Sequence, residues 1–144
     1  MSFLLPADYG LQIRDEIRGL LTDGNDGLLD QAATAAQVEM ESYLRGRYDV
    51  AAVFAATGAA RNAQVVMYLV DMALYHLHSR QNPRNVPQIR QDRYDQVISW
   101  LKMARTGKLS VGLPDLPETN ADGTPNTDTI LPRGGSRPKQ QNTY

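Results

Sequence analysis

The chain has 144 residues and a formal net charge of −1, which favours one domain and argues against a polycation that coats nucleic acid. It contains no cysteine, so disulfides, thiolate metal sites and cysteine nucleophiles are excluded. No apolar run approaches the length of about 20 residues that a bilayer requires, and the first residues lack the basic segment of a signal peptide. We therefore expect a soluble protein that is not secreted by the usual route.

The first predicted helix covers residues 7–21 and follows Pro6, a residue type tolerated at helix starts. Its apolar stripe consists of Leu11, Ile17, Leu20 and Leu21. Residues 22–27 are rich in Asp, Asn and Gly, which favour turns because Gly and Asn adopt positive φ at low cost. This acidic segment does not place the glycine and glutamate of an EF-hand at their required positions in either register, so we interpret it as a structural turn.

The second predicted helix has the clearest periodicity in the chain, with apolar or interior positions three and four residues apart. These positions are Leu29, Ala32, Ala33, Ala36, Met40, Tyr43, Leu44 and Arg47. Glu41 precedes Arg45 by four residues, the favourable order for an ion pair on a helix surface. We expect the helix to end near Gly46.

Residues 49–60 lack periodicity and are predicted to form a loop that could include a short helical turn. The third predicted helix, residues 60–80, is apolar around nearly its whole circumference, which is typical of a central helix or of one that contacts another subunit. A four-helix monomer should not need so much apolar surface, so a contact between subunits could cover the excess. Pro83 ends this helix because the residue before a proline avoids helical conformation.

The fourth predicted helix covers residues 87–106, with Gly107 as its C-terminal cap. Its apolar stripe consists of Tyr94, Val97, Ile98, Leu101 and Ala104. Residues 108–113 could form a single short edge strand. The expected fold is therefore all-α, a compact bundle of about four helices with an extended, irregular C-terminal tail.

The composition changes near Leu113, which divides the chain into a helical domain (1–113) and an extended C-terminal arm (114–144). The arm contains five prolines and three glycines, a composition that cannot bury enough apolar surface to offset its ordering entropy. Acidic residues come first in the arm and basic residues follow, and such charge blocks can set register against complementary partner surfaces. Its candidate docking anchors are Leu113, Leu116, Ile130, Leu131, Arg133, Arg137, Lys139 and Tyr144.

Candidate catalytic and metal-binding groups are sparse. His76 and His78 are two residues apart, so they point to different faces of a helix and cannot grip one ion together. The glycine-rich residues 134–136 lie in the arm, without the strand and helix that flank a phosphate loop. No nucleophile, base and orienting group occur in a recognisable motif. We therefore predict no enzymatic activity, no metal site and no cofactor.

Two segments resemble the small neck proteins of tailed phages and Mu-like prophages. The first runs through the turn at residues 21–27 and Asp30 to residues 41–48, where Tyr-Leu-Arg-Gly-Arg-Tyr at 43–48 is the most specific piece. The second comprises residues 93–101 and the helix exit at residues 104–113. The resemblance covers roughly residues 3–113, and the 49–60 loop and the arm depart from it.

The resemblance implies a head–tail connector, or adaptor, subunit. Such subunits form a ring of identical copies beneath the portal, which extends the DNA channel and offers a platform to the tail or to a further neck protein. It implies a virion structural protein without catalytic activity, made in the host cytoplasm and located in the virion neck, with no membrane partner. The ring is expected to be twelvefold to match a portal, and packaged DNA would pass through it without sequence-specific binding.

The resemblance also makes several residues candidates for subunit or channel contacts: Arg45, Arg47, Tyr48, Arg84, Arg90 and Arg93. For residues 43–48 the alternative is a helix terminus that simply packs on the core. For the whole chain, the alternative is a small helical regulatory or nucleic-acid-binding module with a disordered tail. The near-neutral charge and the lack of a turn followed by a basic recognition helix count against that alternative.

Overall fold

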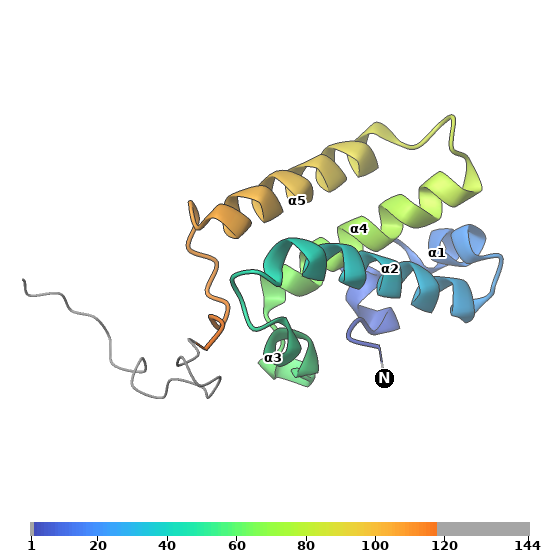
Figure 1. Cartoon of the computed structure of the whole chain (residues 1–144). Coiled ribbons are helices and arrows are strands. Elements are labelled where there is room, and N and C mark those ends of the chain that lie inside the picture. Colours follow the sequence, from blue (N-terminus) through green and yellow to red (C-terminus); the bar gives the residue numbers. More distant parts are fainter. Residues whose placement is uncertain (1, 118–144) are drawn as a thin grey trace, which may run out of the picture.

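The computed structural model describes residues 2–117, which form helices joined by short connections, with no strand in this part of the chain (Figure 1). The elements are η1 (Pro6–Leu11), α1 (Asp15–Thr22), α2 (Asp26–Leu44), α3 (Val50–Ala55), η2 (Gly58–Ala60), α4 (Ala63–Gln81) and α5 (Gln88–Thr106), where η marks a 3-10 helix. The predicted all-α bundle is confirmed. No described helix is both long enough and apolar enough to cross a bilayer.

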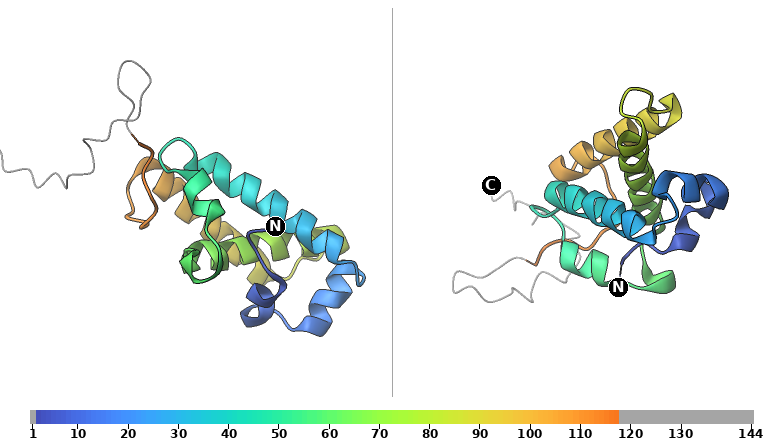
Figure 2. Two further views of the ribbon diagram at one scale, coloured as in Figure 1. Left: turned by 90° about the horizontal axis from the view of Figure 1, so that it is seen from below. Right: turned by 90° about the vertical axis from the view of Figure 1, so that its right-hand side faces the viewer.

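Helix α4 is the centre of the bundle. It packs against both α2 and α5, which run parallel to each other and antiparallel to α4. The N-terminal elements η1 and α1 also contact α4, and they lie on the other side of it from α5 (Figure 2). Residues of α4 such as Val65, Leu69 and Met72 have no exposed surface at all. The prediction of a central helix is thus confirmed, and its apolar circumference is largely covered within the subunit without a neighbouring copy.

The predicted helix over residues 7–21 is wrong, because the chain breaks into η1 and α1 with Arg14 in extended conformation between them. Tertiary contacts replace the missing helical hydrogen bonds at the break. Arg90 donates from Nη2 to the carbonyl of Gln12 at 2.7 Å, and Arg18 ties α1 to the start of η1 by donating from Nη1 to the carbonyl of Pro6 at the same distance. Bonds from a charged guanidinium to a carbonyl are stronger than the neutral backbone bonds they replace.

The apolar stripe expected in that first helix is also largely exposed. Leu11 is fully exposed and Leu20 is 70% exposed, whereas Tyr9, Ile13 and Leu21 are buried. The periodicity of residues 7–21 therefore identified the wrong face, because the segment is not one straight helix.

The acidic segment after α1 is a turn, as its composition predicted. Asp23 and Gly24 both have left-handed conformations, with φ of 52° and 70°. Asn25 then caps α2, because its side-chain oxygen accepts a hydrogen bond from the amide of Gly27 at 2.9 Å. The turn thus reverses the chain between α1 and α2 through residues that tolerate positive φ.

Residues 49–60 are more helical than a loop, since they contain α3 and η2. Asp49 caps α3 by accepting a hydrogen bond from the amide of Ala52. Helix α4 begins at Ala63 rather than at residue 60, because the side chain of Asn62 accepts hydrogen bonds from the amides of Gln64 and Val65. These side-chain caps set the helix starts.

Helix α5 follows its prediction closely. Pro87 precedes its first residue, and Gly107 ends it with a left-handed φ of 74°. Val97, Leu101 and Ala104 of the predicted stripe have no exposed surface, while Tyr94 and Ile98 are partly buried against the core. Trp100, which the predicted stripe omitted, is also buried.

The edge strand that residues 108–113 could have formed is absent, because the described part of the chain offers no partner strand. Val111 and Leu113 instead bury their side chains. Backbone pairing begins just after this segment. The amide of Asp49 donates to the carbonyl of Pro114 at 2.8 Å, and an isolated bridge joins Tyr48 to Asp115.

Candidate functional site

The six predicted contact residues fall at opposite ends of the bundle. Arg45, Arg47 and Tyr48 follow α2, whereas Arg84, Arg90 and Arg93 lie in the connection between α4 and α5 and in the first turns of α5. Because α2 and α5 run in parallel, the end of one and the start of the other are far apart (Figure 1). A single contact surface cannot contain all six.

The Tyr-Leu-Arg-Gly-Arg-Tyr segment joins the ends of α2 and α5. Tyr48 is only 4% exposed, and its hydroxyl donates to the carbonyl of Ala104 at 3.3 Å. The guanidinium of Arg47 lies against Gly107, where an added Cβ would be 2.5 Å from Cζ. These contacts match the alternative in which residues 43–48 are a helix terminus packed on the core. The side chain of Tyr48 therefore packs inside the subunit rather than at a contact surface.

Arg45 and Arg47 remain exposed and have basic neighbours that the sequence reasoning missed. Lys102 and Arg105, in the last two turns of α5, and Lys108, just beyond it, are also exposed. We call these five residues the basic end. The sequence separates the two groups by more than fifty positions, so only the packing of α2 beside α5 brings them to one end. The predicted ion pair is formed, since Nη2 of Arg45 lies 3.6 Å from a carboxylate oxygen of Glu41.

At the other end, Arg90 and Arg93 surround Asp71 of α4, which is 3% exposed. Oδ1 of Asp71 lies 3.6 Å from Nη1 of Arg93 and 3.9 Å from Nη1 of Arg90. Gln12 also binds Arg93, its side-chain oxygen accepting from Nη1 at 2.9 Å. Burial raises the pKa of Asp71, and the two guanidinium charges oppose that rise only in part. Arg90 is nearly buried by these contacts, whereas Arg84 is exposed and Arg93 is partly exposed.

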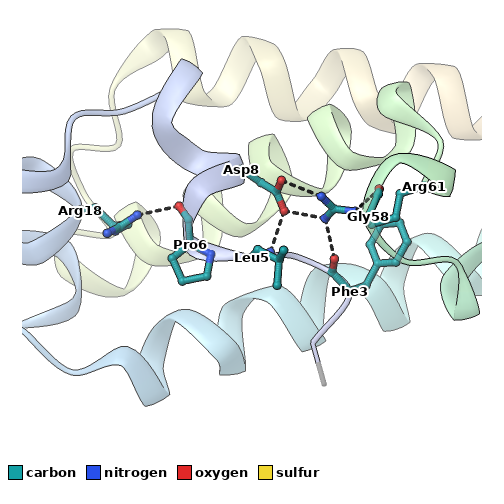
Figure 3. A network of polar contacts seen from close by, with 7 residues as sticks. All are labelled: Phe3, Leu5, Pro6, Asp8, Arg18, Gly58 and Arg61. Carbon is teal, nitrogen blue, oxygen red and sulfur yellow. Dashed lines mark hydrogen bonds and ion pairs between the residues drawn. The ribbon is translucent and has the colours of Figure 1, made fainter.

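A second ion pair fixes the N-terminal segment (Figure 3). Arg61 donates to both carboxylate oxygens of Asp8, at 2.7 and 3.0 Å, and also to the carbonyls of Phe3 and Gly58. The amide of Leu5 donates to the same carboxylate at 2.6 Å. Burial by itself would raise the pKa of Asp8, but the hydrogen bonds and the charge of Arg61 outweigh it and lower that pKa. We call this arrangement the Asp8–Arg61 clamp, and no local pattern in the sequence indicates it.

An apolar groove lies beside the clamp, between η1 and the start of α4. Its volume is about 600 Å³, and Leu11 and Met67 line it together with the apolar parts of Ala63 and Val66. Leu11 is fully exposed and Met67 is 44% exposed. Leu11, whose helical spacing predicted a position facing the core, instead lines this exposed groove.

A cluster of aromatic and ionisable side chains connects the three long helices. Tyr94 of α5 donates to Glu39 of α2, whose other oxygen lies 3.2 Å from Nε2 of His76 on α4. Tyr75 stacks on Tyr94 with ring centroids 4.1 Å apart. His78 faces elsewhere, where burial and the charge of Arg90 lower its pKa. Across residues 2–117, no group of three or more His, Cys, Asp or Glu side chains could hold a metal ion.

Two of the predicted docking anchors are in the described part of the chain. Leu113 is buried in the subunit, and Leu116 is partly exposed with its amide donating to the carbonyl of Arg47 at 3.1 Å. The first residues of the arm thus contact the segment that follows α2. The remaining anchors lie outside the described residues: Ile130, Leu131, Arg133, Arg137, Lys139 and Tyr144.

Comparison with known protein families gives a match over most of the chain. Residues 5–128 match the family described as Bacteriophage Mu, Gp36. No curated protein and no solved structure matches the chain. The match passes residue 113, so the expectation that the family likeness ends there is wrong, and the first part of the arm is included. Because it covers well over half of the sequence, the chain belongs to the Bacteriophage Mu Gp36 family, a family of Mu-like phage proteins.

Proposed function

We propose that this Mu-like phage protein is a head–tail connector subunit, which forms a ring beneath the portal. The ring would extend the DNA channel and offer a docking platform to the tail or to the next neck protein. The family match over residues 5–128 is the observation that carries the proposal, because it makes the chain a phage structural or morphogenesis protein. The sequence resemblance to neck proteins then supplies the finer assignment.

The surface of the subunit is compatible with ring formation. A closed ring is built from heterologous contacts, in which one patch of a subunit meets a different patch of its neighbour. The apolar groove at Leu11 and Met67 is one candidate patch. Val38 of α2 and Met103 of α5 are exposed apolar side chains on other elements, which the groove of a neighbouring subunit could receive.

The proposal includes partners and a location. The subunit would bind copies of itself, twelvefold to match a portal, and then the portal protein and a tail or further neck protein. It would act in the virion neck after synthesis in the host cytoplasm, without catalytic activity and without a membrane partner. Packaged DNA would pass through the ring without sequence-specific contacts.

Electron microscopy of the full-length protein mixed with its cognate portal tests this proposal. We expect an additional ring on the portal, and the same ring in the neck of purified virions. Leu11→Glu should prevent ring formation by placing a charge in the groove, while Leu20→Glu is the matched control at an exposed leucine outside it. A protein that stays monomeric, ignores the portal and is absent from virions would contradict the proposal.

The basic end gives the nucleic-acid-binding alternative a specific surface. If the isolated subunit bound duplex DNA, with an affinity that falls steeply as salt rises, phosphate contacts by these residues would be indicated. Substitution of Lys102 and Arg105 by Gln would then weaken that binding. Ring formation on the portal without such DNA binding would favour the connector.

A further inference from the structure

The basic end carries more positive charge than is needed to balance the partial negative charge at the C-terminal ends of its two helices. Lysine or arginine near a helix C-terminus is favourable because the carbonyl end of the helix carries partial negative charge. Five such residues nevertheless surround the ends of only two helices, α2 and α5. The acidic side chains beside them are Glu41, which pairs with Arg45, Asp49, which caps α3, and Asp115, whose backbone bridges to Tyr48. The basic end therefore has a surplus of exposed positive charge.

The arm leaves the described structure at this same end. The amide of Leu116 donates to the carbonyl of Arg47, and Asp115 forms the bridge with Tyr48. These two contacts fix the start of the arm directly beside Arg47, an exposed residue of the basic end. Whatever follows residue 117 therefore begins within a few residues of the positive charges.

The segment that follows carries the opposite charge. Residues 114–132 contain four acidic residues and no lysine or arginine. The acidic residues are Asp115, Glu118, Asp122 and Asp128. The family match includes all of them and stops before the basic residues that begin at Arg133. The acidic part of the arm thus belongs with the helical domain in the family, and its charge complements the surface where it starts.

We propose that the basic end is the docking surface for the acidic segment, residues 118–128, of the same chain. A covalently attached ligand has an effective concentration of about millimolar for a short flexible connection, so weak ion pairs suffice. The same segment of a second copy would have to compete with that local concentration. Docking would offset the surplus positive charge of the basic end. This proposal does not depend on the connector assignment.

A single introduced cysteine allows a direct test, because the chain has none of its own. The full-length protein with Thr127→Cys, eleven residues beyond the contact at Leu116, would carry a nitroxide label and uniform ¹⁵N. We expect the label to broaden the amide signals of Gly46 and Gly107, which lie at the basic end, and to spare Gly19 of α1. Raising the salt to 1 M, where the Debye length is about 3 Å, should abolish the broadening.

Charge variants show whether the basic end itself holds the segment. Neutralising Lys102, Arg105 and Lys108 with Gln should remove the broadening. The control is Arg14→Gln with Arg84→Gln, which removes exposed arginines from other parts of the surface and should leave the broadening intact. The proposal would be overturned if the broadening persisted after Lys102, Arg105 and Lys108 were replaced by Gln. It would also be overturned if the labelled protein without these substitutions showed no broadening.

A mixing experiment distinguishes the other possible occupants. Nitroxide-labelled chains without ¹⁵N are mixed with ¹⁵N chains without the label, so that only contacts between copies cause broadening. Broadening of Gly107 in this mixture would assign the basic end to a neighbouring copy and overturn docking within one chain. If the label broadened no amide signal of the basic end, but a short DNA duplex shifted those signals, the docking proposal would be overturned in favour of a nucleic-acid surface.

Discussion

The three long helices and the N-terminal segment are stabilised in different ways. Helices α2, α4 and α5 bury continuous apolar faces against one another, with side chains such as Leu69 and Leu101 entirely covered. Residues 2–14 bury fewer apolar side chains and are held at both ends by arginines from elsewhere in the chain. Arg61 binds Asp8, and Arg90 and Arg93 bind Gln12.

This difference predicts two kinds of stability within one subunit. Apolar burial over three helices should give a body that unfolds cooperatively. The N-terminal segment combines a few polar contacts with a smaller apolar burial, mainly of Phe3, Leu4, Tyr9 and Ile13, so it should open locally at a lower cost. Because the apolar groove is built from η1 and the start of α4, the shape of the groove depends on the Asp8–Arg61 clamp.

The largest effect is expected from truncating the centre of the body. Leu69→Ala should lower the free energy of unfolding by about 2–5 kcal/mol, because it removes a fully buried side chain from α4 and leaves a cavity. Met67→Ala is the control on the same helix, since its side chain is 44% exposed and faces the groove. Urea unfolding followed by circular dichroism measures both. Equal losses for the two variants would contradict the central position of Leu69.

Breaking the clamp should cost less and act locally. Asp8→Asn should lower stability by about 1.5–3 kcal/mol, the range for hydrogen bonds to a charged group. Hydrogen exchange should accelerate in residues 3–13 and remain slow in α2 and α4. Asp15→Asn is the matched control, because Asp15 pairs with Arg18 at 3.3 Å with a largely exposed side chain, and such pairs contribute little. Acceleration spread evenly over all helices would show that the N-terminal segment is part of the cooperative body.

A smaller effect is expected where α2 meets α5. Gly107→Ala should cost about 1–2 kcal/mol, the penalty for a side chain in left-handed conformation, and should displace the guanidinium of Arg47. Gly46→Ala is the control, because φ there is not positive and no atom lies within 4 Å of an added Cβ. Thermal unfolding of the two variants gives the comparison. A neutral Gly107→Ala would mean that this junction can relax without strain.

The three long helices, α2, α4 and α5, could be predicted from the sequence because apolar periodicity and helix-end residues are local signals. The periodicity of α2 identified Leu29, Met40 and Leu44 correctly, and Pro87 and Gly107 marked the ends of α5. The N-terminal segment could not be predicted in this way. Arg61 and Arg90, which hold this segment, are more than fifty residues away from Asp8 and Gln12, and Leu11 has helical spacing in a segment that is not one helix.

The candidate surfaces could be predicted only in part, for the same reason. Arg45 and Arg47 were predicted as candidate contact residues, but Lys102 and Arg105 join them only through helix packing. Tyr48 was expected at a contact surface, although its hydroxyl reaches Ala104 of α5 inside the subunit. Sequence spacing identifies faces within one helix, whereas a surface made from two helices requires the tertiary fold.

The smallest effect expected is on the pH dependence of the clamp. The folded protein holds the pKa of Asp8 below 3.8, so the unfolded chain binds a proton at this group more readily. The stability that the ionised carboxylate contributes is therefore fully present above pH 3.8 and is lost as the pH falls through the lower pKa of the folded state. The wild type should exceed Asp8→Asn in stability at neutral pH, and the gap should narrow below pH 3.8. Asp71 has its pKa shifted upward, so its own titration has the opposite sign, and it cancels in the difference between these two proteins. Urea titrations of both proteins across the acid range measure the gap, and a gap that stayed constant would show that the carboxylate charge of Asp8 does not stabilise the N-terminal segment.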